Sequence, residues 1–531
     1  MSQTTSLAVG SCRSWEGTLA LVGSLVLCAG WASAVRGAQA PEMPDKLKEI
    51  RRLVDSGDWK RADELVTAVI SQNSISYEAY EVLGRVKDAE RRYADADAAY
   101  RRAVQLAPNA VSPHVSRGVS LVQRGQTAIA LAEFHEALAK DPRNLAALSN
   151  IASLELAAKH YAEAEKLYQR GQQIAPNDPV ILLGLTTAAF AAGDRKLAQE
   201  TASQLAQADS PPIHFSMGLL FAKNGLYAEA GEQFEVVAKR GAGSPELFLN
   251  LGLAYSEQKK YDAAKANYFR AINLNPDSPL PYARVGSDYL AQKKSSLAVV
   301  WLFRAAKLGQ GQPDTFYMLG RALLDEEYFQ TAHSYLAQYV RLRPDDPKGW
   351  LLLGDAFLND EQLENALDSY QKALKLVPQL ASAHYLVGNA EYLSKRIPEA
   401  KRELLTALRI DPSHAEAQLR LGEIAYREND ADTAANRFRA VLSAHPDDAE
   451  ARYDLAKVCV RQEQYGEARD LLEKVVAQNP NDIRFHYLLS QVYKRLNENG
   501  QSEREWTLYR TIKSAQDFQH RFIRHSHLYV E

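Results

Sequence analysis

Cysteine thiols are the first groups in this 531-residue chain to examine for chemistry, because they form disulfides, nucleophiles and zinc sites. The chain has three cysteines, Cys12, Cys28 and Cys459, and no two of them have zinc-site spacing. If the N-terminal segment is removed, only Cys459 remains, and one thiol cannot form an internal disulfide. Cys459 falls where a helical pattern buries a residue, so we predict a small core side chain.

Histidines near the C-terminus are the second possible site of chemistry. Three of them lie close together: His520, His525 and His527. No carboxylate or cysteine at ligand spacing joins them, which favours a solvated tail over residues 517–531. We therefore predict no metal site and no cofactor.

Catalytic and nucleotide-binding motifs are also missing from the sequence. It contains no G-x-x-x-x-G-K-[ST], no G-x-G-x-x-G after a strand, no H-E-x-x-H and no G-x-S-x-G. The formal net charge of −3 argues against a nucleic-acid binder that works through bulk positive charge. We predict that the chain is not an enzyme and binds neither nucleic acid nor a small-molecule substrate.

The first residues have the pattern of an export signal. Arg13 supplies a positive charge, residues 19–31 form an apolar stretch, and the small residues Ala32 and Ala34 give an A-x-A cleavage pattern. We predict a signal peptide over residues 1–34 and a linker over residues 35–42. An uncleaved anchor over residues 18–34 and a cytosolic chain with an unusual N-terminus are the alternatives. No later stretch is apolar enough to cross a membrane.

The elements that would position any site follow from a 34-residue period set by proline. Pro108, Pro142 and Pro176 are 34 residues apart. The same spacing recurs in a second series: Pro344, Pro378, Pro412, Pro446 and Pro480. Repeats in this register open at residues 43, 77, 111, 145, 179, 211, 245, 279, 313, 347, 381, 415, 449 and 483. We number repeat positions from these opening residues.

Small residues recur at two repeat positions. The twentieth position is alanine in thirteen of fourteen units: Ala62, Ala96, Ala130, Ala164, Ala198, Ala230, Ala264, Ala298, Ala332, Ala366, Ala400, Ala434 and Ala468. The eighth position is glycine nine times: Gly84, Gly118, Gly218, Gly252, Gly286, Gly320, Gly354, Gly388 and Gly422. Each unit reads as two apolar-periodic helices split by a short polar turn. Small residues at both positions predict that the two helices of a pair cross closely at these points.

The spacing of small residue, aromatic, alanine and proline resembles the tetratricopeptide repeat family. The unit that opens at residue 347 shows it well: Trp350, Leu353, Gly354, Phe357, Ala366, Tyr370, Ala373 and Pro378. The resemblance covers residues 43–516 and implies an all-α, right-handed superhelical solenoid of about 14 helix pairs. In this family a concave groove, lined by the first helix of each pair, binds peptides or partner helices.

Groove-facing residues follow from this resemblance, which assigns positions 2, 5, 9 and 12 of the first helix to the groove. In the units opening at 179 and 211 they form an apolar stripe: Leu183, Thr187, Phe190, Phe215, Leu219 and Ala222. In the second half they are rich in tyrosine: Tyr317, Arg321, Tyr385, Asn389, Tyr392, Tyr426, Tyr453 and Tyr487. Tyrosine combines apolar area with a hydroxyl group and suits peptide recognition. We take these residues as candidates for partner binding.

Other interpretations of these positions remain open. Tyrosine at positions 5 and 12 can also serve simply to pack neighbouring helices. Two specialised grooves of the family do not fit. Position 5 lacks the lysine of repeats that clamp a chaperone's C-terminal carboxylate. Only Asn150 and Asn250 match the asparagine ladder of glucosaminyl transferases.

Irregular units mark three places along the array. The first unit has Ile50 at position 8, and the last has Ser490 and Ser502 at both small positions. The second helix of the last unit, about residues 503–516, is expected to form a polar cap. The units opening at 179 and 211 lack the closing proline, so we predict a local change of superhelical twist there.

The sequence thus predicts an exported interaction scaffold in a periplasm or cell envelope that binds other proteins. The alternative is a regulatory or substrate-recruiting subunit of an enzyme or export complex whose catalytic part is a separate chain. Contact with a membrane is expected only through an uncleaved N-terminal anchor.

Overall fold

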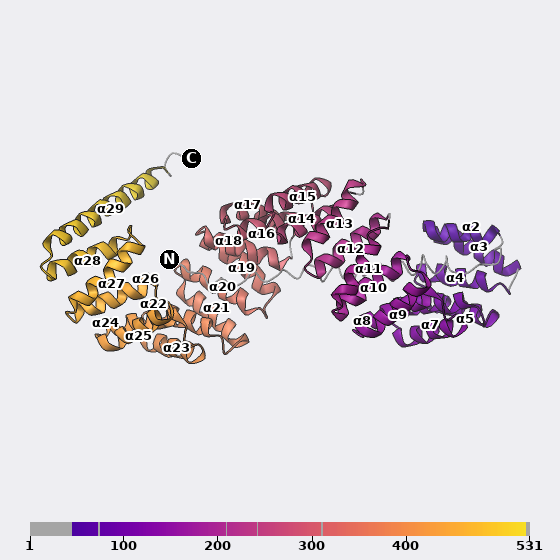
Figure 1. Ribbon diagram of the computed structural model, residues 1–531, viewed down its shortest axis with the longest axis horizontal. Helices are drawn as coiled ribbons and strands as arrows, with labels where there is room; N and C mark the ends of the chain where they lie inside the picture. Colours follow the sequence, from indigo (N-terminus) through magenta and orange to yellow (C-terminus); the bar gives the residue numbers. More distant parts are fainter. Residues whose placement is uncertain (1–44, 73–74, 209, 242, 310–311, 527–531) are drawn as a thin grey trace. The chain divides into compact units, whose positions relative to one another are not determined.

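The computed structural model describes residues 45–72, 75–208, 210–241, 243–309 and 312–526. Over these ranges the chain forms twenty-eight α-helices and no strand (Figure 1). The all-α class and the fourteen helix pairs predicted from the sequence are confirmed. The signal peptide over residues 1–34 and the linker over residues 35–42 lie outside the described residues.

Two compact units divide the chain, residues 1–277 and residues 278–531, and each is described by itself. We call the first helix of each pair the A helix and the second the B helix. In the first unit the pairs are α2 (Asp45–Ser56) and α3 (Trp59–Gln72), α4 (Tyr77–Ala89) and α5 (Tyr93–Leu106), α6 (Val111–Gln123) and α7 (Thr127–Lys140), α8 (Leu145–Ala157) and α9 (Tyr161–Ile174), α10 (Pro179–Ala192) and α11 (Arg195–Leu205), α12 (Pro211–Lys223) and α13 (Tyr227–Lys239), α14 (Pro245–Glu257) and α15 (Tyr261–Leu274).

The second unit contains the other seven pairs. They are α16 (Pro279–Ala291) and α17 (Ser295–Leu308), α18 (Pro313–Asp325) and α19 (Phe329–Leu342), α20 (Pro347–Asn359) and α21 (Leu363–Leu376), α22 (Ala381–Leu393) and α23 (Ile397–Ile410), α24 (Ala415–Arg427) and α25 (Ala431–Ala444), α26 (Ala449–Arg461) and α27 (Tyr465–Gln478), α28 (Ile483–Arg495) and α29 (Asn499–Ser526). Within each unit, most neighbouring A helices contact one another, whereas the part of the chain described shows no comparable contact between B helices. The A helices therefore lie on the inner side of the stack.

The residue at position 15 has a positive φ angle, in the left-handed region, and forms the turn between the two helices of each pair. Glycine occupies this position four times, at Gly57, Gly125, Gly193 and Gly225. The other ten units use side-chain-bearing residues: Arg91, Lys159, Lys259, Lys293, Glu327, Glu361, Lys395, Asn429, Glu463 and Asn497. The next amide then bonds back to the A helix, as Arg92 N does to the carbonyl of Lys87 at 2.8 Å. This hydrogen bond closes a Schellman-type helix end, which reverses the chain within three residues.

The close approach predicted within each pair exists, but its partner differs from the one the sequence suggested. The alanines at position 20 are fully buried, whereas the space beside each glycine at position 8 is filled mainly by the residue at position 24. A Cβ added to Gly252 would lie 2.4 Å from the ring of Tyr268, and one added to Gly118 would lie 2.5 Å from the ring of Phe134. The glycine makes room for a large ring that fills the gap between the two helices.

The repeat opening at residue 179 has no glycine at position 8, and its two helices are packed differently. Its position 8 is Thr186, whose hydroxyl donates to Thr201 Oγ1 at 2.9 Å between α10 and α11. Two positions earlier, Gly184 receives the ring of Tyr168 from the preceding repeat. Helix α11 ends early, at Leu205, which is buried in the same core cluster as Met217 and Leu220 of α12. The packing thus departs from the common pattern here, while the predicted change of twist stays a prediction.

The last helix extends beyond residue 516, where the sequence predicted the end of the solenoid. Helix α29 continues to Ser526, so residues 517–526 of the predicted C-terminal tail are helical. The physical reason is that neither proline nor glycine follows Gly500 to end the helix. The described part of α29 is also less polar than the expected cap, since Trp506 and Leu508 are exposed. Among the described residues, no helix combines the length and apolar character needed to span a membrane.

Candidate partner-binding site

The surface formed by repeat positions 2, 5, 9 and 12 of the A helices, here called the A-helix face, carries the candidate residues. At its start in the second unit, Tyr317 on α18 is half-buried and its ring lies 5.1 Å from that of Tyr339. Burial raises the pKa of Tyr317 above its usual value. Arg321, one turn further along the same helix, is exposed.

Asp355 on α20 is a residue of this face that sequence reasoning missed. It occupies position 9, as Arg321 and Asn389 do in the neighbouring repeats. Its Oδ1 accepts a hydrogen bond of 2.7 Å from the hydroxyl of Tyr370. Burial raises the pKa of the Asp355 carboxyl group to about 6, although the Tyr370 hydrogen bond opposes the rise. The presence of a carboxylate at position 9, a predicted groove position, could have identified Asp355 from the sequence.

Replacing Asp355 by asparagine is expected to stabilise the chain at high pH. Because the folded pKa is raised from 3.8 to about 6, the wild type loses stability as the pH rises through this interval. The asparagine side chain cannot ionise, so the Asp355→Asn variant should be more stable by about 1 kcal/mol at pH 8 and no more stable at pH 3.5. Urea unfolding at both pH values measures the difference. Asp368→Asn on α21, at an exposed site, is the control and should show no such pH-dependent gain.

Tyr385, Asn389 and Tyr392 project from α22. The ring of Tyr385 lies 5.1 Å from that of His414, and Tyr385 is half-buried. Asn389 is buried, and its Oδ1 has no hydrogen-bond partner. Tyr392 is also buried, so its ring is not available to a partner. Its hydroxyl donates to Glu423 Oε1 on α24 at 2.7 Å, which makes it a tie between two A helices.

Glu423 is the centre of a charged cluster around Tyr392. It forms ion pairs with Arg420 at 2.5 Å and with Arg427 at 2.9 Å. Both guanidinium groups lie over the Tyr392 ring, at 4.7 and 5.4 Å from its centroid. Burial would raise the pKa of Glu423, but the Tyr392 hydrogen bond and the two arginines outweigh it, and the pKa lies below its usual value.

Tyr426 and Tyr453 flank a lysine on the next two A helices. Lys457 Nζ lies 5.2 Å from the ring centroid of Tyr426 and 5.3 Å from that of Tyr453. The lysine also pairs with Asp454 at 2.7 Å. Burial lowers the pKa of Lys457, but the charge of Asp454 and its hydrogen bond outweigh this effect, so the pKa is raised. The guanidinium carbon of Arg461 lies 3.5 Å from the ring centroid of Tyr426. The rings of Tyr426 and Tyr453 both remain partly accessible beside these cations.

Tyr487 is the exposed tyrosine at the end of the face. Its ring lies 6.1 Å from Trp506 and 5.3 Å from Tyr509, both on α29. Trp506 occupies position 24, where the other units bury a residue between their own A helix and the next one. Because no further A helix follows α29 among the described residues, the Trp506 ring stays exposed.

The apolar stripe predicted in the first unit is divided between the core and the surface. Leu183, Leu219 and Ala222 are buried, whereas Thr187, Phe190 and Phe215 keep accessible surface. The Phe190 ring packs edge-on against Phe221 at 6.2 Å, and the Phe215 ring lies 5.6 Å from Phe234. Each of these two phenylalanines thus packs against another phenylalanine and still keeps part of its surface accessible.

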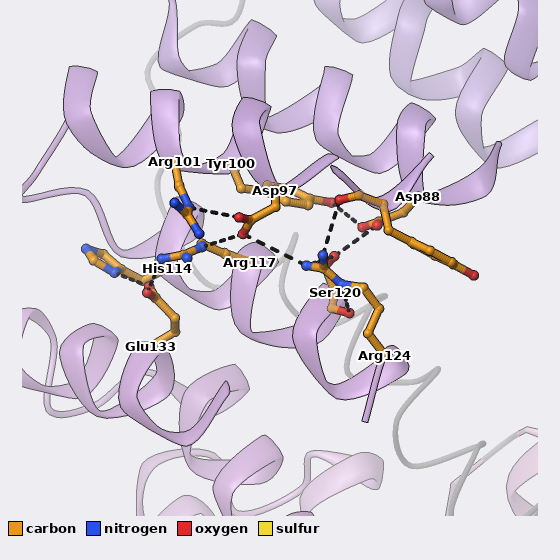
Figure 2. Close-up of polar contacts among 10 residues, drawn as sticks. Asp88, Asp97, Tyr100, Arg101, His114, Arg117, Ser120, Arg124 and Glu133 are labelled. Atoms are coloured by element: carbon orange, nitrogen blue, oxygen red, sulfur yellow. Dashed lines mark hydrogen bonds and ion pairs between the residues drawn. The ribbon is translucent and has the colours of Figure 1, made fainter. Parts of the chain in front are cut away.

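A polar network between the repeats opening at 77 and 111 was not predicted. Figure 2 shows its residues pointing toward one another from α4, α5, α6 and α7. Asp88 accepts hydrogen bonds from Ser120 at 2.9 Å and from Tyr100 at 3.1 Å. Burial raises the pKa of Asp88, while these two hydrogen bonds oppose the rise. The network joins neighbouring helices and thus holds the two repeats together.

Arg117 links the other half of this network (Figure 2). Its guanidinium group bonds to Asp97 at 3.1 Å and to Glu133 at 2.5 Å. Asp97 also pairs with Arg101 at 2.8 Å, and Glu133 contacts His114 Nδ1 at 2.8 Å. Every carboxylate in this chain of contacts faces a donor, which is the condition for burying charge without a large loss of stability.

Groups suited to metal binding or nucleophilic chemistry do not assemble in the described residues. No cluster of three or more histidine, cysteine, aspartate or glutamate side chains occurs there. Cys459 is buried, as predicted, and burial raises the pKa of its thiol to about 11, which keeps it protonated. An open depression of about 550 Å³ lies beside Glu364 and Arg396, but it is a shallow surface feature at a helix turn.

Comparison with known proteins gives matches along most of the chain. Family models described as tetratricopeptide repeat match residues 47–111, 115–179, 183–245, 245–278, 317–381, 385–435 and 425–492. Among curated proteins, the chain is 24% identical over 183 residues to "Protein CTR9 homolog" of Arabidopsis thaliana. That alignment covers 33% of this chain and 17% of the relative, so the chain spans about a sixth of the relative's length.

Two solved structures are among those similar to parts of this chain. The structure of YrrB, titled a TPR protein with an unusual peptide-binding site, is 24% identical, covers 35% of this chain and 96% of its own, and has a TM-score of 0.34. The structure of the APC/C hetero-tetramer Cut9–Hcn1 is 14% identical, covers 87% of this chain and 92% of its own, and has a TM-score of 0.42.

Proposed function

This chain belongs to the tetratricopeptide repeat family, and from that premise we propose that it binds segments of partner proteins on its A-helix face. Such repeat proteins are typically interaction scaffolds. The proposal is specific to the second unit, where tyrosines recur at equivalent positions of successive A helices. It assigns the binding surface to α18, α22, α24, α26 and α28.

One observation carries this proposal. Of the six tyrosines that the sequence placed on the face of the second unit, five keep accessible surface: Tyr317, Tyr385, Tyr426, Tyr453 and Tyr487. A ring whose only role was packing would be buried, as Tyr392 and the tyrosines at position 24 are. Partly exposed tyrosines combine apolar area with a hydroxyl group, and the rings of Tyr426 and Tyr453 also lie beside Lys457; such rings suit an extended or helical partner segment.

The test places a photo-crosslinking residue on the A-helix face of the full chain in its native cells. Crosslinkers at positions 426 and 453 should capture the same partner, whereas one at Asn436, on the B helix α25, should not. A Tyr426→Ala/Tyr453→Ala variant should lose capture while its melting temperature changes little. Equal capture from position 436, or a lower melting temperature with unchanged capture, would instead assign these tyrosines to packing.

The location that we propose for this scaffold is the periplasm or another part of a cell envelope. Its support is the N-terminal pattern of Arg13, the apolar residues 19–31 and the A-x-A sequence that ends at Ala34. Mass spectrometry of the chain from its native cells should find a mature N-terminus at residue 35. An intact N-terminus in a membrane fraction would support the anchor, and one in the cytosol would contradict export.

A further inference from the structure

The outward face of helix α17 is apolar. Leu297, Val300 and Phe303 lie three residues apart, on one side of the helix, and are 45%, 63% and 37% exposed. Helix α17 packs against α16 and α18 through its opposite side, which contains the buried residues Ala298, Leu302 and Ala305. Leu297 and Val300 therefore project outward, while Phe303 contacts the ring of Tyr335 on α19 at 6.3 Å and still keeps 37% of its surface exposed.

The repeat fold does not require apolar residues at these places. Leu297, Val300 and Phe303 occupy repeat positions 19, 22 and 25. In α27 the same positions hold acidic, exposed residues: Glu467, Asp470 and Glu473. In α21 they hold polar residues: Asn365, Asp368 and Gln371. The apolar face therefore distinguishes α17 from α21 and α27, and it exposes surface that water solvates poorly.

Positive charge predominates around this apolar face, although Asp325 of α18 accepts a hydrogen bond of 2.8 Å from Ser295 at the first residue of α17. Lys293 and Lys294 precede α17, Arg304 and Lys307 follow in its last turns, and all four are exposed. No aspartate or glutamate occurs in the sequence between Asp288 and Asp314. Lys307 Nζ lies 4.7 Å over the Phe303 ring, and Arg304 lies 5.9 Å over Tyr282. Within the described ranges, none of these four cations forms an ion pair with a carboxylate.

The combination of three projecting apolar side chains and four flanking cations fits a particular kind of surface. Apolar side chains of this kind insert at the boundary between lipid headgroups and acyl chains, while nearby lysines and arginines are attracted to anionic headgroups. The side chains project from the helix and do not line a depression. The deformable, negatively charged surface of a lipid bilayer therefore fits these projecting side chains better than the rigid side chains of a folded partner do.

We propose that the outward face of α17 binds the surface of an anionic lipid bilayer. The helix would lie along the bilayer, with Leu297, Val300 and Phe303 in the interfacial region and Lys293, Lys294, Arg304 and Lys307 among the headgroups. This binding is peripheral and separate from the partner site on the A-helix face. It would hold the scaffold at a membrane through its folded part, whether or not the N-terminal segment is retained.

The first test locates residue 300 directly in the full chain bound to vesicles. A nitroxide is attached to Val300→Cys in a chain with Cys12→Ser and Cys28→Ser, and to Ser334→Cys on the B helix α19 as the control. On phosphatidylcholine vesicles with about one-third phosphatidylglycerol, the label at 300 should become accessible to lipid-soluble oxygen and shielded from an aqueous nickel complex. The label at 334 should stay aqueous. A label at 300 that also stays aqueous overturns the proposal, even if residues 1–44 bind the vesicles.

The second test compares two matched double variants by vesicle flotation. Leu297→Glu/Val300→Asp and Thr331→Glu/Ser334→Asp each add two negative charges at repeat positions 19 and 22. The first variant should lower the apparent partition coefficient by about tenfold or more, and the second by much less. Circular dichroism shows whether both fold alike. Equal partitioning of the two folded variants, or equal wild-type binding to purely zwitterionic vesicles, contradicts the proposal.

Discussion

Replacing Gly354 by alanine is expected to lower the free energy of unfolding by about 3 kcal/mol. An alanine Cβ here would lie 2.3 Å from Cε1 of Tyr370 and 2.5 Å from its Cδ1, well inside van der Waals contact. The ring cannot move away easily, because Tyr370 is fully buried and its hydroxyl is bonded to Asp355. The strain therefore outweighs the roughly 1 kcal/mol by which alanine favours a helix over glycine.

Urea unfolding measures this effect, and hydrogen exchange in α20 and α21 shows whether it is local, since repeat arrays unfold in parts. Gly466→Ala in the first turn of α27 is the matched control, because nothing lies within 4 Å of an added Cβ there. It should be neutral or should stabilise the chain by up to about 1 kcal/mol. A Gly354→Ala variant as stable as the control would show that position 8 does not need glycine.

The substitution Arg117→Met is expected to destabilise the first unit by about 3 kcal/mol. Methionine keeps most of the aliphatic stem but removes the guanidinium group that faces Asp97 and Glu133. Both carboxylates are largely buried, with 19% and 13% of their side-chain surface exposed. Arg101 and His114 remain as partial partners, so the expected loss lies at the lower end of that for a broken buried pair.

Chemical unfolding at pH 7, combined with hydrogen exchange in α5, α6 and α7, measures the loss. Lys166→Met is the control, because Lys166 pairs with Glu163 on the surface, where its side chain is 72% exposed. Surface pairs of this kind contribute about 0–1 kcal/mol, so the control should stay close to the wild type. If both variants lose the same stability, the network of Figure 2 does not couple the two repeats.

The sequence predicted which residues lie on the A-helix face but not which of them are accessible to a partner. Tyr392 and Tyr426 both occupy position 12, and the sequence gives no reason to separate them. The structure buries Tyr392 beneath Arg420 and ties it to Glu423, while Tyr426 stays partly accessible beside Lys457. The burial of the two tyrosines differs because the residues that contact each ring belong to the following repeat, some thirty residues away in sequence.

The sequence by itself determined the helix pairs, their order and their register, because turns, closing prolines and small residues are local signals repeated many times over. It also predicted that small residues allow the two helices of a pair to approach closely. Only the tertiary structure decided that residue 24 fills the space beside the glycine, that half of the apolar stripe near Phe190 and Phe215 is buried in the core, and that burial raises the pKa of Asp355. These outcomes depend on side chains that meet across helices, where burial and charge are set by groups that no periodic pattern places together.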